Sequence, residues 1–449
     1  MIFIPLLFIG ILLYLSGKRI ASSLIFFFFL TDGFQITPLA LFDTGIGMSK
    51  SLDFAFLYIF LIFLYGVFFY ENFINQNKIS SIIKIFCAFI IISIIVNRYI
   101  YGVAWSEIIR TSRYFFFVLA YYIFRRLDLN DINQLLKILF YICLVQCCIY
   151  AIQSVVGIPL LTGESESKIG QFGELNRYYN IPILFYYFLF YAIFNNPFKL
   201  KRKKYFSISI FFIVAIVSMH RSLIAPVFIL PILGVFLFEK SIKKTMQYIL
   251  VSIICIIFFG EIILSRFQEN TSSDIELVTS GGFIEYDNEL SDGTFLFRVA
   301  LFYERWDYIM EANVFRKIFG VGFMTEDSHQ TNSLFDFKVG LTDDEQRVVQ
   351  LDTSDIAWVN FILRLGFLGT LIYISLYCYF LFFFYKNKKE DYLHIIPFLY
   401  ILLLLITSVS SSSLFHTWMI IPLFLNYITA TEKNINNEEN KCPNISIQL

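Results

Sequence analysis

The chain has 449 residues, of which 57% are apolar, 19% aromatic and only 16% charged, and its formal net charge is zero. The cores of the two or three soluble domains that this length could hold cannot bury so many apolar residues. The composition therefore excludes an ordinary soluble protein and indicates that lipid is the solvent.

Apolar runs recur along the whole chain, and about 12–13 of them predict helices that cross roughly 30 Å of hydrocarbon. The fold class that we expect is all-α: a polytopic integral membrane helical bundle with one large extracytoplasmic loop containing short helices. Residues 1–16 lack a basic leader and a cleavage site, which favours a spanning helix over a signal peptide. The second run, 20–42, contains Asp32, Gly33 and Pro38 and is expected to be broken or re-entrant.

Short loops rich in Lys and Arg stay on the cytoplasmic side of a membrane. In the predicted order of spans, six such loops fall on one side: 18–19, 78, 125–126, 199–204, 240–244 and 386–389. The long loop must then face outward. The expected divisions are an N-terminal transmembrane bundle over 1–264, the large extracytoplasmic loop over 265–354, C-terminal transmembrane helices over 355–430 and a cytoplasmic tail over 431–449. No cysteine lies in the loop, and the four His show no ligand spacing, so we expect neither a disulfide framework nor a metal site.

Several arginines lie near the outer boundary of the predicted spans. Arginine is disfavoured there, so its presence needs a structural or functional explanation. They are Arg98, Arg110, Arg113, Arg177 and Arg221. A guanidinium group binds phosphate oxygens in a bidentate manner, and a pyrophosphate-linked lipid headgroup lies at this depth. The alternative for each arginine is a place at the interface beside aromatic rings or a pairing with a local acid. For Arg221, in the turn 218–222 without an acidic neighbour in sequence, function is favoured.

Within the loop, residues 295–312 have the pattern of an amphipathic helix. A spacing of seven puts Arg298 and Arg305 on one face, with Phe302 between them. Such a helix could lie on the membrane surface with both guanidinium groups directed at headgroups. The alternative is a lid helix in which the arginines pair with acids of the same helix.

The loop also carries the candidate general bases, which an acceptor hydroxyl needs to take its proton. They are Glu326, Asp327, His329, Asp352 and Asp355. Residues 265–354 contain 17 Asp plus Glu against 7 Lys plus Arg, so most of the acids simply solvate the loop. Asp352 and Asp355 stand where the chain returns to the membrane, and partial desolvation there would raise the pKa of a carboxylate. The alternative for Asp355 is a helix-capping acid.

Taken in order, these features resemble the superfamily of O-antigen polymerases (Wzy-type) and O-antigen ligases, which are bacterial membrane glycan-assembly proteins. The similar motifs are the Ser-Arg turn 218–222, Arg298 followed four residues later by Phe302, Gly320-Val321-Gly322, and Asp355 eleven residues before Gly366-Phe367-Leu368-Gly369. At the last position the ligases have a His-Asn pair. Asp355 stands in place of that His, which favours a polymerase over a ligase.

The resemblance implies a metal-independent glycosyltransferase without a cofactor. It would join undecaprenyl-pyrophosphate-linked oligosaccharide repeat units into a surface polysaccharide (the O-antigen of lipopolysaccharide, a capsule or an exopolysaccharide). The reaction would take place at the outer face of the bacterial cytoplasmic (inner) membrane, with the large loop in the periplasm. Asp355, or less readily His329, would activate the acceptor, and Arg298 would act with it. Arg113, Arg177, Arg221 and Arg305 would bind the pyrophosphates. The expected partners are the lipid-linked donor and acceptor, the lipid bilayer and a chain-length regulator, and no nucleic acid.

Three alternatives remain open at this stage. A ligase would transfer the glycan to a lipid or protein acceptor. A flippase or other transporter should show charges inside several spans and matched halves with broken helices, whereas the predicted spans are almost free of acids apart from Asp32. A membrane scaffold without activity would need no outward arginines.

Overall fold

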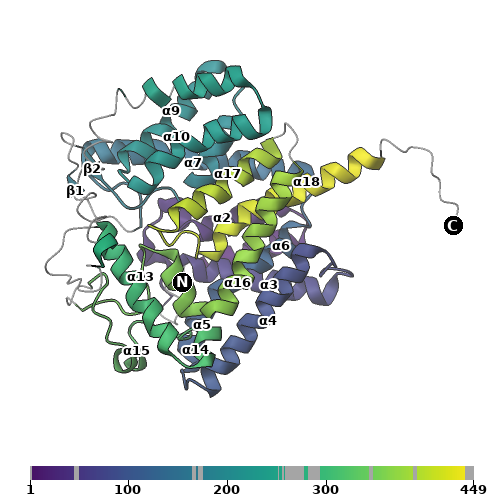
Figure 1. Ribbon diagram of the computed structural model, residues 1–449. Coiled ribbons are helices and arrows are strands. Elements are labelled where there is room, and N and C mark those ends of the chain that lie inside the picture. Colours follow the sequence, from purple (N-terminus) through teal and green to yellow (C-terminus); the bar gives the residue numbers. More distant parts are fainter. Residues whose placement is uncertain are drawn as a thin grey trace.

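The structure is a computed structural model that describes residues 3–44, 50–163, 168–169, 175–250, 252–254, 257, 278–281, 294–342, 347–387 and 392–439. In this part of the chain the protein is predominantly α-helical, as predicted. Its strands form one small antiparallel pair, β1 (Lys168–Ile169) with β2 (Asn176–Arg177). Figure 1 shows the helices packed beside one another in one bundle, from which the end of the C-terminal helix α18 projects. Much of the loop 265–354, including its first residues, lies outside the described ranges.

The first part of the chain supplies a series of mostly apolar helices, with the strand pair in the connection between α7 and α8. They are α1 (Phe3–Leu15), α2 (Arg19–Leu30), η1 (Gly33–Gln35), η2 (Leu39–Phe42), α3 (Ser51–Phe69), α4 (Lys78–Tyr99), α5 (Trp105–Ser112), η3 (Arg113–Leu119), α6 (Ala120–Phe124), α7 (Leu129–Val156), α8 (Phe185–Phe194), α9 (Lys201–Val217), α10 (Arg221–Gly234) and the π-helical turn η4 (Val235–Glu239). The remaining helices are α13 (Thr294–Glu311), α14 (Val314–Phe319), α15 (His329–Leu334), α16 (Ala357–Lys386), α17 (Tyr392–Thr407), η6 (Thr417–Ile420) and α18 (Ile421–Glu439).

Five helical stretches of the described chain are long and apolar enough to cross a membrane. They are Ser51–Phe69, Lys78–Tyr99, Leu129–Val156, Ser222–Glu239 and Ala357–Lys386. Shorter apolar helices, α1, α2, α8 and α17, accompany them. Many apolar side chains on these helices are exposed to the surroundings, among them Phe8, Phe68, Ile92 and Leu371. These features fit a membrane protein with several spans.

The second predicted span is broken, as its sequence indicates. Helix α2 ends at Leu30, and Asp32, Phe34 and Gln35 then adopt positive φ angles of 51°, 55° and 53°. One backbone group at this break finds a side-chain partner, as buried polar groups must: Gln146 Nε2 donates to the Phe34 carbonyl at 2.7 Å. The side chain of Gln35 in turn accepts the amide hydrogen of Ile183 at 3.0 Å, which joins the break to the segment before α8.

Two of the predicted cytoplasmic turns meet at one end of the bundle. Arg19 donates to the carbonyl oxygen of Arg126, and the Arg126 guanidinium lies 4.6 Å from the centre of the Tyr70 ring. The turns 18–19 and 125–126 are far apart in the sequence. The predicted topology places both turns on the cytoplasmic side.

Part of the loop 265–354 packs against α16 through two glycines. The helix predicted over 295–312 is present as α13, Thr294–Glu311. After α14, Gly320 and Gly366 bring backbone directly against backbone: a side chain on Gly366 would collide with the amide of Gly320 and the carbonyl of Ile318. Gly366 has φ 61° and ψ −170° and kinks α16, and the Val321 amide donates to the Leu363 carbonyl at 2.7 Å. The Gly-x-Gly and Gly-x-x-Gly motifs are therefore parts of one contact.

Candidate functional site

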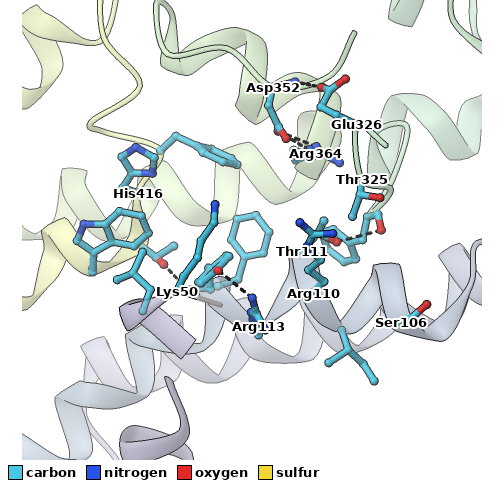
Figure 2. Close-up of a pocket in the computed structure, with 18 of the residues that line it drawn as sticks. Lys50, Ser106, Arg110, Thr111, Arg113, Thr325, Glu326, Asp352, Arg364 and His416 are labelled. Carbon is cyan, nitrogen blue, oxygen red and sulfur yellow. Dashed lines mark hydrogen bonds and ion pairs between the residues drawn. The ribbon is translucent and has the colours of Figure 1, made fainter. Parts of the chain in front are cut away.

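A cavity of about 870 Å³ opens where the loop meets the ends of several helices. Its walls come from the residues before and at the start of α3, from α5 and η3, from the segment after Gly322, from α16 and from the turn before η6, as Figure 2 shows. The lining residues are Lys50, Leu52, Ser106, Ile109, Arg110, Thr111, Arg113, Tyr114, Phe115, Phe323, Thr325, Glu326, Asp327, Asp352, Arg364, Phe415, His416, Thr417 and Trp418. In the predicted topology, every one of these segments lies at the outer end of its span.

Arg113 is held at the cavity by a buried carboxylate. Its Nη2 lies 2.6 Å from Asp53 Oδ1, with the two side chains 13% and 2% exposed, and it also donates to the Tyr114 hydroxyl at 2.9 Å. The Arg113 Nε is buried and has no hydrogen-bond partner. A buried cation is retained only with a compensating group, and Asp53 in the first turn of α3 supplies it.

Arg364 fixes the opposite wall. Its guanidinium lies 2.6 Å from Asp352 Oδ1 and donates to the carbonyl oxygens of Gly322 and Met324. It is buried in α16, so these contacts tie the segment after Gly322 and the return segment at Asp352 to the membrane domain. Arg364 lies in an apolar run, a position where an arginine requires such partners.

Glu326, near Arg364, binds the backbone of the return segment. Its carboxylate accepts the amide hydrogens of Gln350, Leu351 and Asp352. Burial raises the pKa of Glu326, and the nearby Asp352 carboxylate adds to this effect while the Arg364 guanidinium and the amide hydrogen bonds oppose it. The carboxylate oxygens of Glu326 thus bind the backbone of the return segment, although burial disfavours their ionised form.

Two cations at the cavity are more open to solvent. Lys50 is exposed, and Figure 2 shows its side chain extending into the cavity. Arg110 is also exposed, and its nearest acid is Asp327, at 3.9 Å between Nη1 and Oδ2, with both side chains more than half exposed. An exposed pair at this distance contributes little to stability. Lys50 and Arg110 are therefore available to bind an anion that enters the cavity.

The turn 411–416 between α17 and η6 places an imidazole in the wall. His416 Nε2 lies 3.2 Å from Ser412 Oγ, and the His416 ring stacks on Trp418 with centroids 4.3 Å apart and an interplanar angle of 13°. Burial lowers the pKa of His416 to about 4, against the opposing effect of Asp352. The ring therefore favours its neutral form, in which one nitrogen carries a lone pair.

Aromatic rings complete the lining. Phe115 lies 5.7 Å from both Phe323 and Phe415 between ring centroids, and Tyr114 lies 6.3 Å from Trp418. Flat apolar faces beside charged and hydroxyl groups are suited to a ligand that has both apolar faces and polar edges, as sugar rings do.

The structure gathers only part of the predicted set in this cavity. Arg113 lines it, together with Arg110 and three of the five candidate bases, Glu326, Asp327 and Asp352. Asp355 does not line it. Asp355 forms an ion pair with Arg298 at 3.3 Å, with both side chains about a quarter exposed, on the same return segment as Asp352. The two residues predicted as the catalytic pair are therefore in contact with each other, and the Arg298 Nε is buried without a partner.

Arg305 and His329 have other surroundings. Arg305 is 2% exposed; it pairs with Glu304, donates to the Val339 and Val349 carbonyl oxygens and lies 4.4 Å from the Phe337 ring. The protein encloses its guanidinium, which ties α13 to the segment 337–349 and does not face the cavity. His329 begins α15, is exposed and is not among the lining residues.

The other two predicted arginines belong to a separate region. The Arg177 guanidinium lies 4.7 Å from the Tyr179 ring, and Tyr179 lies 6.0 Å from the His220 ring. Tyr179 thus links Arg177 to His220 in the turn 218–222. The side chain of Arg221 lies outside the described part of the chain.

Among the basic residues of the cavity, Lys50, Arg364 and His416 are those that the sequence alone did not single out. Arg364 carried a usable signal, since an arginine inside an apolar run is energetically unfavourable without partners. Lys50 and His416 carried none, because only the folded chain brings the start of α3 and the turn before η6 to the same space.

Neither models of known protein families nor curated proteins give a match to this chain. The resemblance to the O-antigen polymerase and ligase superfamily therefore rests on the sequence motifs and their order alone.

Proposed function

We propose that the protein is a glycosyltransferase that polymerises undecaprenyl-pyrophosphate-linked oligosaccharide repeat units at the outer face of the cytoplasmic membrane. The observation that carries this proposal is the composition of the cavity: Lys50, Arg110 and Arg113 on one side and aromatic rings around them. A sugar linked to a pyrophosphate needs both kinds of surface. The acids and the imidazole in the same cavity give it groups that can accept a proton.

The cations have a defined task in such a reaction. When the anomeric carbon of the donor bonds to the acceptor hydroxyl oxygen, the bond to the pyrophosphate breaks and negative charge develops on the leaving group. Guanidinium and ammonium groups already in position stabilise that charge without reorganising. Arg113, fixed by Asp53 and Tyr114, is the best positioned of them. Lys50 and Arg110 can adjust to the ligand because both are exposed.

The location of the cavity supports the side of the membrane that we propose. Its walls come from positions at the outer ends of the spans in the topology set by the basic loops. The Arg19 and Arg126 turns meet elsewhere, at the predicted cytoplasmic end. A donor whose lipid tail lies in the outer leaflet would reach the cavity through its headgroup. The Arg177 and 218–222 region, on the same predicted side, is a second place for a pyrophosphate.

The experiment that tests this function uses the full chain in lipid nanodiscs, supplied with lipid-linked repeat units extracted from cells that lack the protein. Wild-type protein should convert single units into a ladder of longer glycans and release undecaprenyl pyrophosphate. Arg113→Gln should accumulate single units, whereas Arg126→Gln, a matched change at the opposite end, should still polymerise. Absence of longer glycans with the wild type, or equal ladders from both variants, would overturn the proposal. A flippase would move the units without lengthening them.

A further inference from the structure

We propose that His416 is the catalytic base that accepts the proton of the acceptor hydroxyl, and that the bound pyrophosphate makes its imidazole more basic. This inference rests on the proposed function. It assigns the acceptor-activating role to the turn before η6, in place of Asp355 or His329.

The surroundings of His416 hold the ring in one orientation. In the tautomer whose Nε2–H donates to Ser412 Oγ, at 3.2 Å, Nδ1 keeps its lone pair. The stacked Trp418 ring limits rotation of the imidazole, at 4.3 Å between centroids. The Ser412 amide in turn donates to the Ser354 carbonyl at 2.9 Å, which joins this turn to the return segment. A base must be held in place in this way to reach a substrate proton.

Three of the five other candidate bases, Asp352, Glu326 and Asp355, are already paired within the protein, whereas Asp327 is mostly exposed beside Arg110. Asp352 Oδ1 receives two donors from Arg364, at 2.6 and 3.2 Å. Glu326 receives three backbone amides, Asp355 is paired with Arg298, and His329 is exposed outside the lining. Taking a proton at any of the three paired carboxylates would weaken a contact that shapes the site. His416 can gain a proton and keep its contact with Ser412.

The charge of the cavity explains why the base would respond to the donor. The charged groups that face this space are the cations Lys50, Arg110, Arg113 and Arg364 and the acids Glu326, Asp327 and Asp352. In the empty site, burial disfavours the imidazolium of His416 and the Asp352 carboxylate opposes this effect. A pyrophosphate bound by Lys50, Arg110 and Arg113 would bring further negative charge into the space that His416 lines and so favour proton uptake by the imidazole. The imidazole would then become a stronger base only when a donor is present.

The proposed step is balanced. The O–H bond of the acceptor breaks, and its proton goes to His416 Nδ1. The acceptor oxygen bonds to the anomeric carbon of the donor, whose bond to the pyrophosphate oxygen breaks with the electron pair remaining on that oxygen. Undecaprenyl pyrophosphate leaves, and the imidazolium returns its proton to solvent.

The first test does not depend on activity. The chain has four His, so the full-length protein labelled with ¹⁵N-histidine should give few imidazole resonances, and His416→Asn identifies the one that belongs to His416. Inorganic pyrophosphate is the probe. We expect the pKa of His416 to rise on its addition, and that of His329, the matched exposed imidazole, to stay unchanged. An unchanged His416 pKa at saturating pyrophosphate would overturn the second half of the proposal.

The second test measures turnover in the nanodisc assay. Loss of a general base typically reduces the rate by about 10²–10⁴ fold, so His416→Asn should fall in that range while His329→Asn keeps the wild-type rate. Added imidazole should partly restore His416→Ala, which a purely structural role would not allow. If His416→Asn retains the wild-type rate and pH profile while Arg113→Gln is inactive, this inference fails and the proposed function stands. If the wild type itself makes no polymer, the proposed function fails.

Discussion

Replacing Gly366 by alanine tests whether the backbone contact between α16 and the loop builds the cavity. Gly366 has φ 61° and ψ −170°, a conformation that essentially only glycine adopts. A Cβ atom there would collide with the Gly320 amide and the Ile318 carbonyl, both backbone atoms that cannot rotate away. Relief of this collision requires α14 and the Gly320–Gly322 turn to move away from the helix.

The expected loss of stability follows from these two effects. The unfavourable backbone conformation costs about 1–3 kcal/mol. Overpacking against fixed neighbours costs about 1–3 kcal/mol more. The hydrogen bond from the Val321 amide to the Leu363 carbonyl would be strained as well. A total of about 2–6 kcal/mol is therefore expected.

The measurement is thermal unfolding of the full-length protein in detergent, with Gly17→Ala as the matched control. Gly17 also has a positive φ, 81°, but a Cβ atom there would meet no other atom within 4 Å, so its alanine variant should lose only about 1–2 kcal/mol. Gly366→Ala should unfold at a clearly lower temperature and make less polymer, because Phe323 and Thr325 follow the displaced turn into the cavity wall. Equal unfolding temperatures for the two variants would refute the argument.

Three further predictions concern single side chains of the loop. Arg305→Lys should lower the unfolding temperature, since a single ammonium cannot reproduce the hydrogen bonds to the Val339 and Val349 carbonyls and the stacking on Phe337; a wild-type melting curve would contradict this. Burial raises the pKa of Glu326 above 4.5, so its stabilising effect is present below the ordinary glutamate pKa and is lost as the pH rises through the raised value. The unfolding temperature of the wild type relative to Glu326→Gln should thus increase as the pH falls from neutral toward 4.5, and a constant difference would count against it. Asp355→Asn should still extend glycans at a reduced rate, measured in the nanodisc assay, because His416 would accept the proton; complete loss of chain extension with normal insertion would return the role of base to Asp355.

The sequence was sufficient for the helical class, the broken second segment and the helix at 294–311, because each depends on local composition and periodicity. The sequence also identified the Gly-x-Gly motif at 320–322 and the Gly-x-x-Gly motif that begins at Gly366. It did not show that the two motifs are in contact. The contact is between backbone atoms of Gly320 and Gly366, which are 46 positions apart in the sequence. No pattern of side chains predicts it.

The arginines show where reasoning from local sequence stops. Arg113 and Arg305 both stand out as cations in unfavourable places, and the same argument selects both. In the structure Asp53 and Tyr114 hold Arg113 at the cavity, whereas the carbonyl oxygens of the loop enclose Arg305. An unfavourable position implies that a partner exists, but it does not say whether the partner is a ligand or the protein itself. Segments that are distant in the sequence determine which kind of partner an arginine has. For the same reason His416, whose neighbours in sequence indicate no function, becomes a candidate only once the fold is known.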